Sequence, residues 1–133
     1  MLKLLTATVA LSVVSGALLA ESAPTITVQR MSMETAMEIA REAVASCRKQ
    51  GIQIGVTVVD RDGTVQAALR DTIAAPITLR ISRHKAFTAA NFNAATSALG
   101  ERADTPIGRG KGLVMPAGGL PIEAGGMLLG AVG

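Results

Sequence analysis

The segment IQIGVTVVDRDGTVQAALR, residues 52–70, contains two runs of alternating apolar and polar residues joined by a tight-turn sequence. In Ile52–Asp60 the alternate residues 52, 54, 56 and 58 are isoleucine or valine, so one face of an extended chain would be apolar. The run Thr64–Arg70 continues the alternation, and the dipeptide Asp62-Gly63 between the runs is typical of a two-strand hairpin. The segment therefore predicts an antiparallel β-hairpin.

Helical patterns flank this hairpin on both sides. Before it, apolar residues recur at helical spacing up to Gln50, with Ser32 in the N-cap position and Gly51 as the stop signal. After it, Pro76 suits a first helical turn, and a second helix is expected up to about Asn93. A short further helix is expected over residues 96–102.

The last third of the sequence is rich in glycine and contains short apolar runs. Three short strands are predicted, at residues 113–115, 120–122 and 127–132, separated by the glycine pairs 118–119 and 125–126. The predicted order is therefore helix, two strands, helix, three strands. This order favours an α+β domain whose helices cover a mostly antiparallel, five-stranded sheet.

The first twenty residues have the pattern of a secretory signal peptide. Lys3 supplies a positive start, residues 4–19 carry no charge, and small residues precede Glu21. The apolar run is shorter than the ~20 residues that a membrane span needs, so no stable anchor is expected after cleavage. We therefore expect a signal peptide at 1–20, an extended lead-in at 21–31, one domain at 32–133, and a periplasmic or secreted protein.

Composition excludes some classes of partner. Of the 13 basic residues only Lys3 lies in the signal peptide, which leaves 12 basic against 10 acidic residues, too small an excess to indicate nucleic acid. With no tryptophan or tyrosine and only two phenylalanines, the chain has no aromatic surface for stacking bases. The lone Cys47 cannot form an intramolecular disulfide. The domain is small, so self-association would help to stabilise it.

The predicted second helix holds the candidate site. It carries the single histidine, His84, and one turn later Thr88, so both side chains can address one point beside Ile77 and Ile81. An imidazole beside apolar surface and cations suits a flat, anionic, iron-bearing ligand. A structural or surface histidine and a solvated basic face are the competing interpretations. One histidine without partners at ligand spacing excludes an ordinary zinc site.

Two other functions remain open at this point. A small-molecule hydrolase or isomerase would use Asp60, Asp71 and His84, although no catalytic motif surrounds them. A ligand-free oligomeric regulatory protein would need none of these residues. We assign no catalytic residue from the sequence.

Three segments together resemble the GlcG/HbpS-type haem-binding family, which is also described as haem-degrading. They are GVTVVDRDGTVQAALR (55–70), RHKAFTAANFNAAT (83–96) and GGLPIEAGGMLLGAVG (118–133). The resemblance implies a profilin-like, three-layer α/β/α domain around five antiparallel strands, often in homo-oligomers. It also implies haem or a related tetrapyrrole as ligand, with a role in haem sensing, sequestration or breakdown. Other relatives are encoded in glycolate- or diol-utilisation operons, so the resemblance leaves an enzyme or accessory protein of that catabolism as an alternative.

The resemblance also guides the choice of site residues. Thr88 falls on the threonine of the family's K-A-[FY]-T-A motif, which implies haem contact, whereas the role of His84 as iron ligand is our own inference. Relatives continue into a terminal helix, so the chain is expected to be short at its C-terminus. The haem-site candidates are His84 or Thr88 for iron, Arg80, Arg83 or Lys85 for the propionates, and Phe87 or Phe92 against the macrocycle.

Overall fold

The structure is a computed structural model that describes residues 24–133. The predicted signal peptide lies outside this range. Of the predicted extended lead-in, the described part, residues 24–31, forms no strand. No helix in residues 24–133 has the length and hydrophobicity that a membrane span requires.

Within the described range the chain forms two α-helices and a four-stranded sheet. Residues 96–102, predicted as one short helix, form two single 3₁₀ turns instead. In chain order the elements are α1 (Met33–Lys49), β1 (Gly55–Asp60), β2 (Val65–Arg70), α2 (Ile77–Phe92), η1 (Thr96–Ala98), η2 (Gly100–Arg102), β3 (Leu120–Ala124) and β4 (Met127–Val132).

The caps of α1 follow the sequence signals. The Ser32 hydroxyl accepts a hydrogen bond from the Thr35 amide at 3.2 Å, which satisfies one of the free N–H groups of the first turn. The helix ends at Lys49, and Gly51 then takes a positive φ of 75°, which glycine adopts without strain. The predicted start and end of this helix are thus confirmed to within a residue.

The strands lie in the order β2-β1-β4-β3, and every neighbouring pair is antiparallel. The predicted hairpin forms β1 and β2, which are joined by the turn at residues 61–64. Beyond β4, Gly133 extends the pairing with β1 through two backbone hydrogen bonds to Thr57, at 2.9 and 3.0 Å. The sheet is therefore built from two hairpins that meet along β1 and β4.

The prediction of five strands is wrong, because residues 113–115 form no strand. The Val114 amide donates to the hydroxyl of Thr88 on α2 at 2.9 Å, so a side chain takes the place of a neighbouring strand. The next residue but one, Pro116, has no N–H to give to a ladder. The three-residue run is apolar because Met115 is buried, with 2% of its surface exposed, and not because it lies in the sheet.

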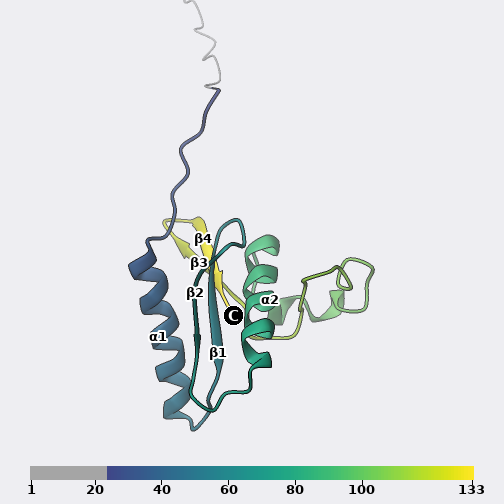
Figure 1. Cartoon of the computed structure of the whole chain (residues 1–133). Coiled ribbons are helices and arrows are strands. Elements are labelled where there is room, and N and C mark those ends of the chain that lie inside the picture. Colours follow the sequence, from purple (N-terminus) through teal and green to yellow (C-terminus); the bar gives the residue numbers. More distant parts are fainter. Residues whose placement is uncertain (1–23) are drawn as a thin grey trace, which may run out of the picture.

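The two helices cover opposite faces of the sheet, as Figure 1 shows. One core cluster joins α1 to β1 and β2 and contains Ala36, Ala40, Val56 and Val58. The other lies beneath α2 and joins Val59 and Ala131 to three alanines of the helix. The alternation predicted for β1 thus sends successive valines into two different cores, which confirms an α+β domain with an antiparallel sheet between two helices.

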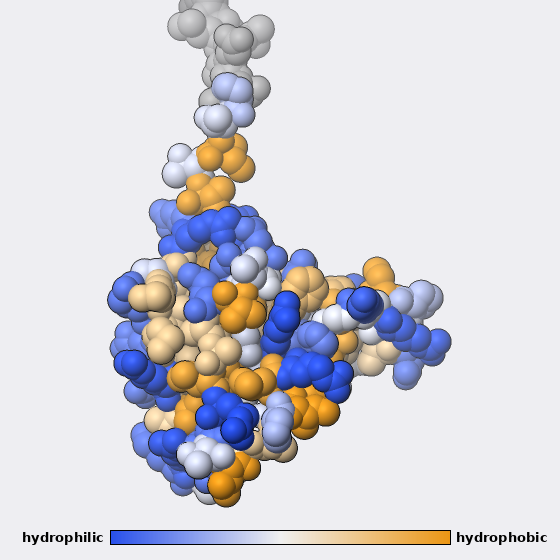
Figure 2. All heavy atoms as spheres, viewed as in Figure 1, coloured by the Kyte–Doolittle hydropathy of each residue, from blue (hydrophilic) through white to orange (hydrophobic). Residues whose placement is uncertain are grey.

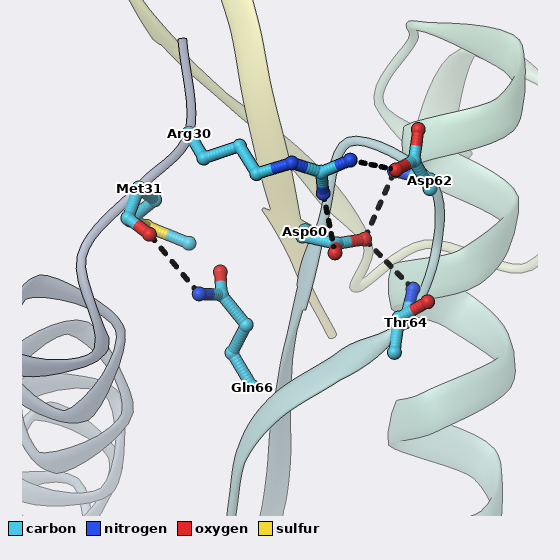
Figure 3. Close-up of polar contacts among 6 residues, drawn as sticks. All are labelled: Arg30, Met31, Asp60, Asp62, Thr64 and Gln66. Carbon is cyan, nitrogen blue, oxygen red and sulfur yellow. Dashed lines mark hydrogen bonds and ion pairs between the residues drawn. The ribbon is translucent and has the colours of Figure 1, made fainter. Parts of the chain in front are cut away.

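Polar contacts hold the chain before α1 against the β1–β2 hairpin (Figure 3). Arg30 forms ion pairs with Asp60, at 2.9 Å, and with Asp62. The Gln66 side-chain amide donates to the Met31 carbonyl at 3.0 Å. Asp60 also accepts from the turn amides, so its carboxylate both closes the hairpin and anchors the segment that leads into α1.

Candidate functional site

A hollow of about 320 Å³ lies along the first half of α2, on the opposite side of the sheet from α1. Three isoleucines give it an apolar wall, and Lys85 supplies a cation at its border. Figure 2 shows hydrophobic residues gathered in the lower half of this view, interrupted by hydrophilic ones. The lining residues are Ile54, Gly55, Ile77, Thr78, Ile81, Ser82, Lys85, Gly118 and Gly133.

Close packing of α2 on β1 shapes the floor of the hollow. A Cβ atom on Gly55 would lie 2.5 Å from the Thr78 side-chain oxygen and 2.9 Å from the Leu79 nitrogen, so only glycine permits this approach. Deeper in the interface, the hydroxyls of Thr57 and Ser82 are 2.8 Å apart and both side chains are buried. The polar groups of the floor are therefore satisfied within the protein.

The apolar wall stays open to solvent. Ile77 is 53% exposed at the start of α2, and Ile81 is half-buried one turn later. Exposed aliphatic side chains beside a concave surface are common in sites that bind apolar ligands. The wall therefore suits the flat face of an organic molecule better than it suits an ion.

Lys85 joins the hollow to the glycine-rich segment before β3. Its Nζ donates to the Ala117 carbonyl at 2.6 Å. A Cβ on Gly118 would lie 3.0 Å from the same nitrogen, so glycine leaves room for the ammonium group. Among the described residues Nζ makes this one hydrogen bond, and an ammonium carries three donors. Lys85 can therefore also bind an anionic group of a ligand.

Thr88, the second candidate iron contact, is fully buried. Its hydroxyl donates to the His84 carbonyl at 2.7 Å and accepts from the Val114 amide at 2.9 Å. Nearby, the Thr96 hydroxyl bonds to the Pro116 carbonyl and the Gly119 amide, each at 2.9 Å. In this arrangement Thr88 helps to hold residues 114–119 on α2, and its haem contact stays a prediction.

His84 lies on α2 one turn after Ile81 and is half-buried. Its ring makes no hydrogen bond with any residue in 24–133, and it does not line the hollow. Arg80 and Arg83 are exposed and likewise lie outside the lining. Of the predicted cations, the structure thus brings only Lys85 to the hollow, while His84 stands next to its apolar wall.

The two phenylalanines lie in different places. Phe87 packs against the β1–β2 turn, since a Cβ on Gly63 would approach its ring to 2.6 Å. Phe92 lies under the guanidinium of Arg102, whose central carbon is 6.0 Å from the ring centroid. Neither ring lines the hollow. Aliphatic residues and glycines, which sequence reasoning did not select as ligand contacts, form the wall instead.

The residues of the alternative enzyme site are dispersed. Asp60 ends β1 at the hairpin turn and pairs with Arg30. Asp71 follows β2 at the opposite end of the hairpin, where Arg48 binds it through two contacts of 2.6 Å. Across residues 24–133, no three histidine, cysteine or acidic side chains cluster as metal ligands. The structure therefore does not gather Asp60, Asp71 and His84 into one centre.

Comparisons with known proteins give a consistent match. The family model "Haem degrading protein HbpS-like" matches residues 31–133. A crystal structure of a double mutant of Streptomyces reticuli HbpS is 31% identical, covering 90% of this chain and 83% of that one, with a TM-score of 0.78. A second HbpS crystal structure is 33% identical, covering 86% and 82%, also with a TM-score of 0.78.

A more distant neighbour is the crystal structure of PduOC in complex with haem, 22% identical. It covers 79% of this chain and 81% of that one, with a TM-score of 0.72, and at this identity it shows the shared fold alone. Comparison with curated protein sequences found no significant match. The family model and the two HbpS structures agree over nearly all of the described chain. The protein therefore belongs to the HbpS-like family.

Proposed function

We propose that this protein binds haem or a related tetrapyrrole in the hollow along α2. Membership of the HbpS-like family supports the ligand class, and the haem complex of PduOC indicates that this architecture is compatible with haem. The observation that carries the proposal is an aliphatic hollow of about 320 Å³ with Lys85 at its border. An apolar wall beside one cation complements a macrocycle that is apolar over its faces and acidic at one edge.

The size of the hollow fits part of the ligand. Small-molecule pockets have volumes of roughly 300–1,000 Å³, and a tetrapyrrole belongs toward the larger end of that range. The macrocycle would therefore lie against Ile77 and Ile81 with one part outside the hollow. Ile77, already 53% exposed, would lose contact with water on binding, which favours association.

The polar residues divide the remaining roles. Lys85 would bind a propionate, since its Nζ has donors beyond the one used by Ala117. Arg80 and Arg83 are proposed for the second propionate, where guanidinium forks match carboxylates. His84 is proposed as the iron ligand, because it is the single imidazole and stands one turn from Ile81. When bound, haem iron supplies ligand-binding and redox chemistry that its axial ligand tunes.

Absorbance titration with haemin tests this proposal. The Ile77→Asp variant places a carboxylate on the apolar wall, and an acidic residue in the first turn of α2 also favours the helix. We expect haemin affinity to fall roughly tenfold or more, because the bound macrocycle would desolvate the new carboxylate and the carboxylate would repel the propionates. The matched control is Ile73→Asp, which changes an isoleucine that is 78% exposed and outside the hollow.

Equal affinity of the two variants and the unmodified protein would exclude the α2 hollow as the site. Iron ligation is read separately from the position of the haem absorbance bands. His84→Ala is expected to shift these bands, whereas Thr88→Ser, which keeps the hydroxyl, is expected to leave them in place. If the bands of His84→Ala do not shift, the imidazole of His84 is not an iron ligand.

We further propose that the protein acts outside the cytoplasm and self-associates. The signal-type pattern of residues 1–20 supports export. Leu120 and Met127, 55% and 43% exposed at opposite ends of the β3–β4 hairpin, are apolar side chains that self-association would cover. Cell fractionation and light scattering of the purified protein test these two points. No observation favours the enzyme alternative, because its three residues are dispersed.

A further inference from the structure

A second hollow, of about 290 Å³, lies between α1 and the end of β2, on the face of the sheet opposite to α2. It differs from the first in its charge, because three arginines and one aspartate contribute to its wall. Its lining residues are Arg41, Val44, Ala45, Arg48, Leu69, Arg70 and Asp71.

A buried carboxylate fixes one of the three arginines. The Asp71 side chain is 2% exposed and accepts two hydrogen bonds from the Arg48 guanidinium, both at 2.6 Å. The Thr72 amide donates to the same carboxylate at 2.7 Å. These bonds, those from Arg48 foremost, lower the pKa of Asp71 and keep it ionised. Arg48 uses two of its five N–H donors here, and its side chain is 60% exposed.

Backbone carbonyls fix the second arginine, and the helix positions the third. The Arg70 guanidinium donates to the Ala74 carbonyl at 2.5 Å and to the Thr72 carbonyl at 3.4 Å. Arg41 precedes Arg48 by two helical turns, so both project from the same side of α1. Two of the three guanidinium groups are therefore held in place before any ligand arrives, which lowers the entropic cost of binding.

The charges around this hollow do not cancel. Three guanidinium groups against one carboxylate leave a formal excess of two positive charges, and Asp71 is the single acidic residue in the lining. Planar guanidinium forks match the oxygen atoms of phosphate and donate short, charge-assisted hydrogen bonds to them. The geometry points to a binding site for a phosphate-type oxyanion formed by Arg41, Arg48 and Arg70, separate from the haem site proposed on α2.

Isothermal titration calorimetry with inorganic phosphate, at an ionic strength held constant with chloride, tests this site. The test variants are Arg41→Gln and Arg70→Gln, singly and together, because both side chains are exposed and Asp71 keeps its partner. Each loss of a charge-assisted contact is expected to weaken phosphate binding about tenfold, and the double variant about a hundredfold. The control, Arg61→Gln with Arg109→Gln, removes the same charge from exposed positions elsewhere and is expected to bind as the unmodified protein does.

Two results would overturn the site. One is phosphate binding that is equally strong in the Arg41, Arg70 double variant. The other is an absence of saturable heat in the unmodified protein, which would leave ordinary charge screening as the sole effect. Haemin titration of the double variant is expected to match that of the unmodified protein, because the two hollows lie on opposite faces of the sheet. The phosphate titration and the haemin titration therefore test the two proposals independently, so one proposal can fail while the other holds.

Discussion

Replacing Thr88 by valine separates two roles for the most buried hydroxyl of α2. The side chain is fully buried, donates to the His84 carbonyl at 2.7 Å and accepts from the Val114 amide at 2.9 Å. Valine has nearly the same shape, so the substitution removes the hydroxyl without opening a large cavity. The stability change then reports the two hydrogen bonds of this hydroxyl, of which the one from Val114 holds residues 114–119 on the helix.

The expected loss of stability comes mainly from the Val114 amide. The His84 carbonyl lies within α2 and keeps its backbone hydrogen-bond partner in the helix. Removing the bond from the Thr88 hydroxyl to this carbonyl therefore costs little stability. Val114 is half-buried, and its N–H would lose its partner; a buried donor left without a partner costs about 1–3 kcal/mol. We therefore expect the free energy of unfolding to fall by about 2 kcal/mol. The melting temperature of a domain of this size falls by roughly 4–8 °C for each kcal/mol.

Urea unfolding followed by circular dichroism measures this change, and amide hydrogen exchange at Val114 localises it. Thr64→Val is the matched control, because Thr64 is exposed and its hydroxyl makes no hydrogen bond within the described chain. A Thr88→Val variant as stable as the unmodified protein, with unchanged protection at Val114, would refute the structural role. Loss of haem bands in a variant that stays folded would instead favour the haem contact implied by family resemblance.

Three further substitutions test the packing, the Arg48–Asp71 ion pair and the haem site. Gly55→Ala should lower the free energy of unfolding by about 1–3 kcal/mol, because the new Cβ would lie 2.5 Å from a hydroxyl of α2. In the control Gly100→Ala the new Cβ meets no atom within 4 Å, so stability should not change. Equal urea midpoints for the two variants would contradict this. Arg48 lowers the pKa of Asp71 from 3.8, so the stability that the pair provides is complete above that pH and is lost as pH falls through the lowered pKa. The stability difference between the unmodified protein and Asp71→Asn should therefore shrink in acid, and a difference constant down to about pH 2 would exclude the linkage. Lys85→Met should weaken haemin binding about tenfold in an absorbance titration. Unchanged affinity would exclude Lys85 as a propionate contact.

Local signals predicted the parts of the fold that depend on local interactions. The turn at Asp62-Gly63 and the cap at Ser32 are set by residues within four positions of one another, and both lie where the sequence placed them. The run at 113–115 was misjudged because its partner, Thr88, is 26 residues away on a helix. The sequence of an apolar triplet before a proline does not reveal whether its backbone N–H groups donate to a neighbouring strand or to a side chain.

The candidate site was predicted only in part for the same reason. Of the three cations that the sequence suggested for the propionates, only Lys85 lines the hollow, and the hollow itself requires Gly55, Gly118 and Gly133 to meet beside α2. These glycines are distant in sequence, and no local pattern joins them. The separation of Phe87 from Phe92, in contrast, follows from helix geometry, because five positions correspond to about 140° around the axis.

Nuclear magnetic resonance with zinc protoporphyrin locates the ligand most directly. This probe keeps the macrocycle and both propionates of haem, and its closed-shell metal leaves nearby amide signals observable. If the tetrapyrrole binds along α2, the largest amide shifts will occur at Gly55, Ile81 and Gly118, and they will saturate with the absorbance change. Shifts concentrated on α1, or spread evenly at saturating ligand, would contradict the proposed site.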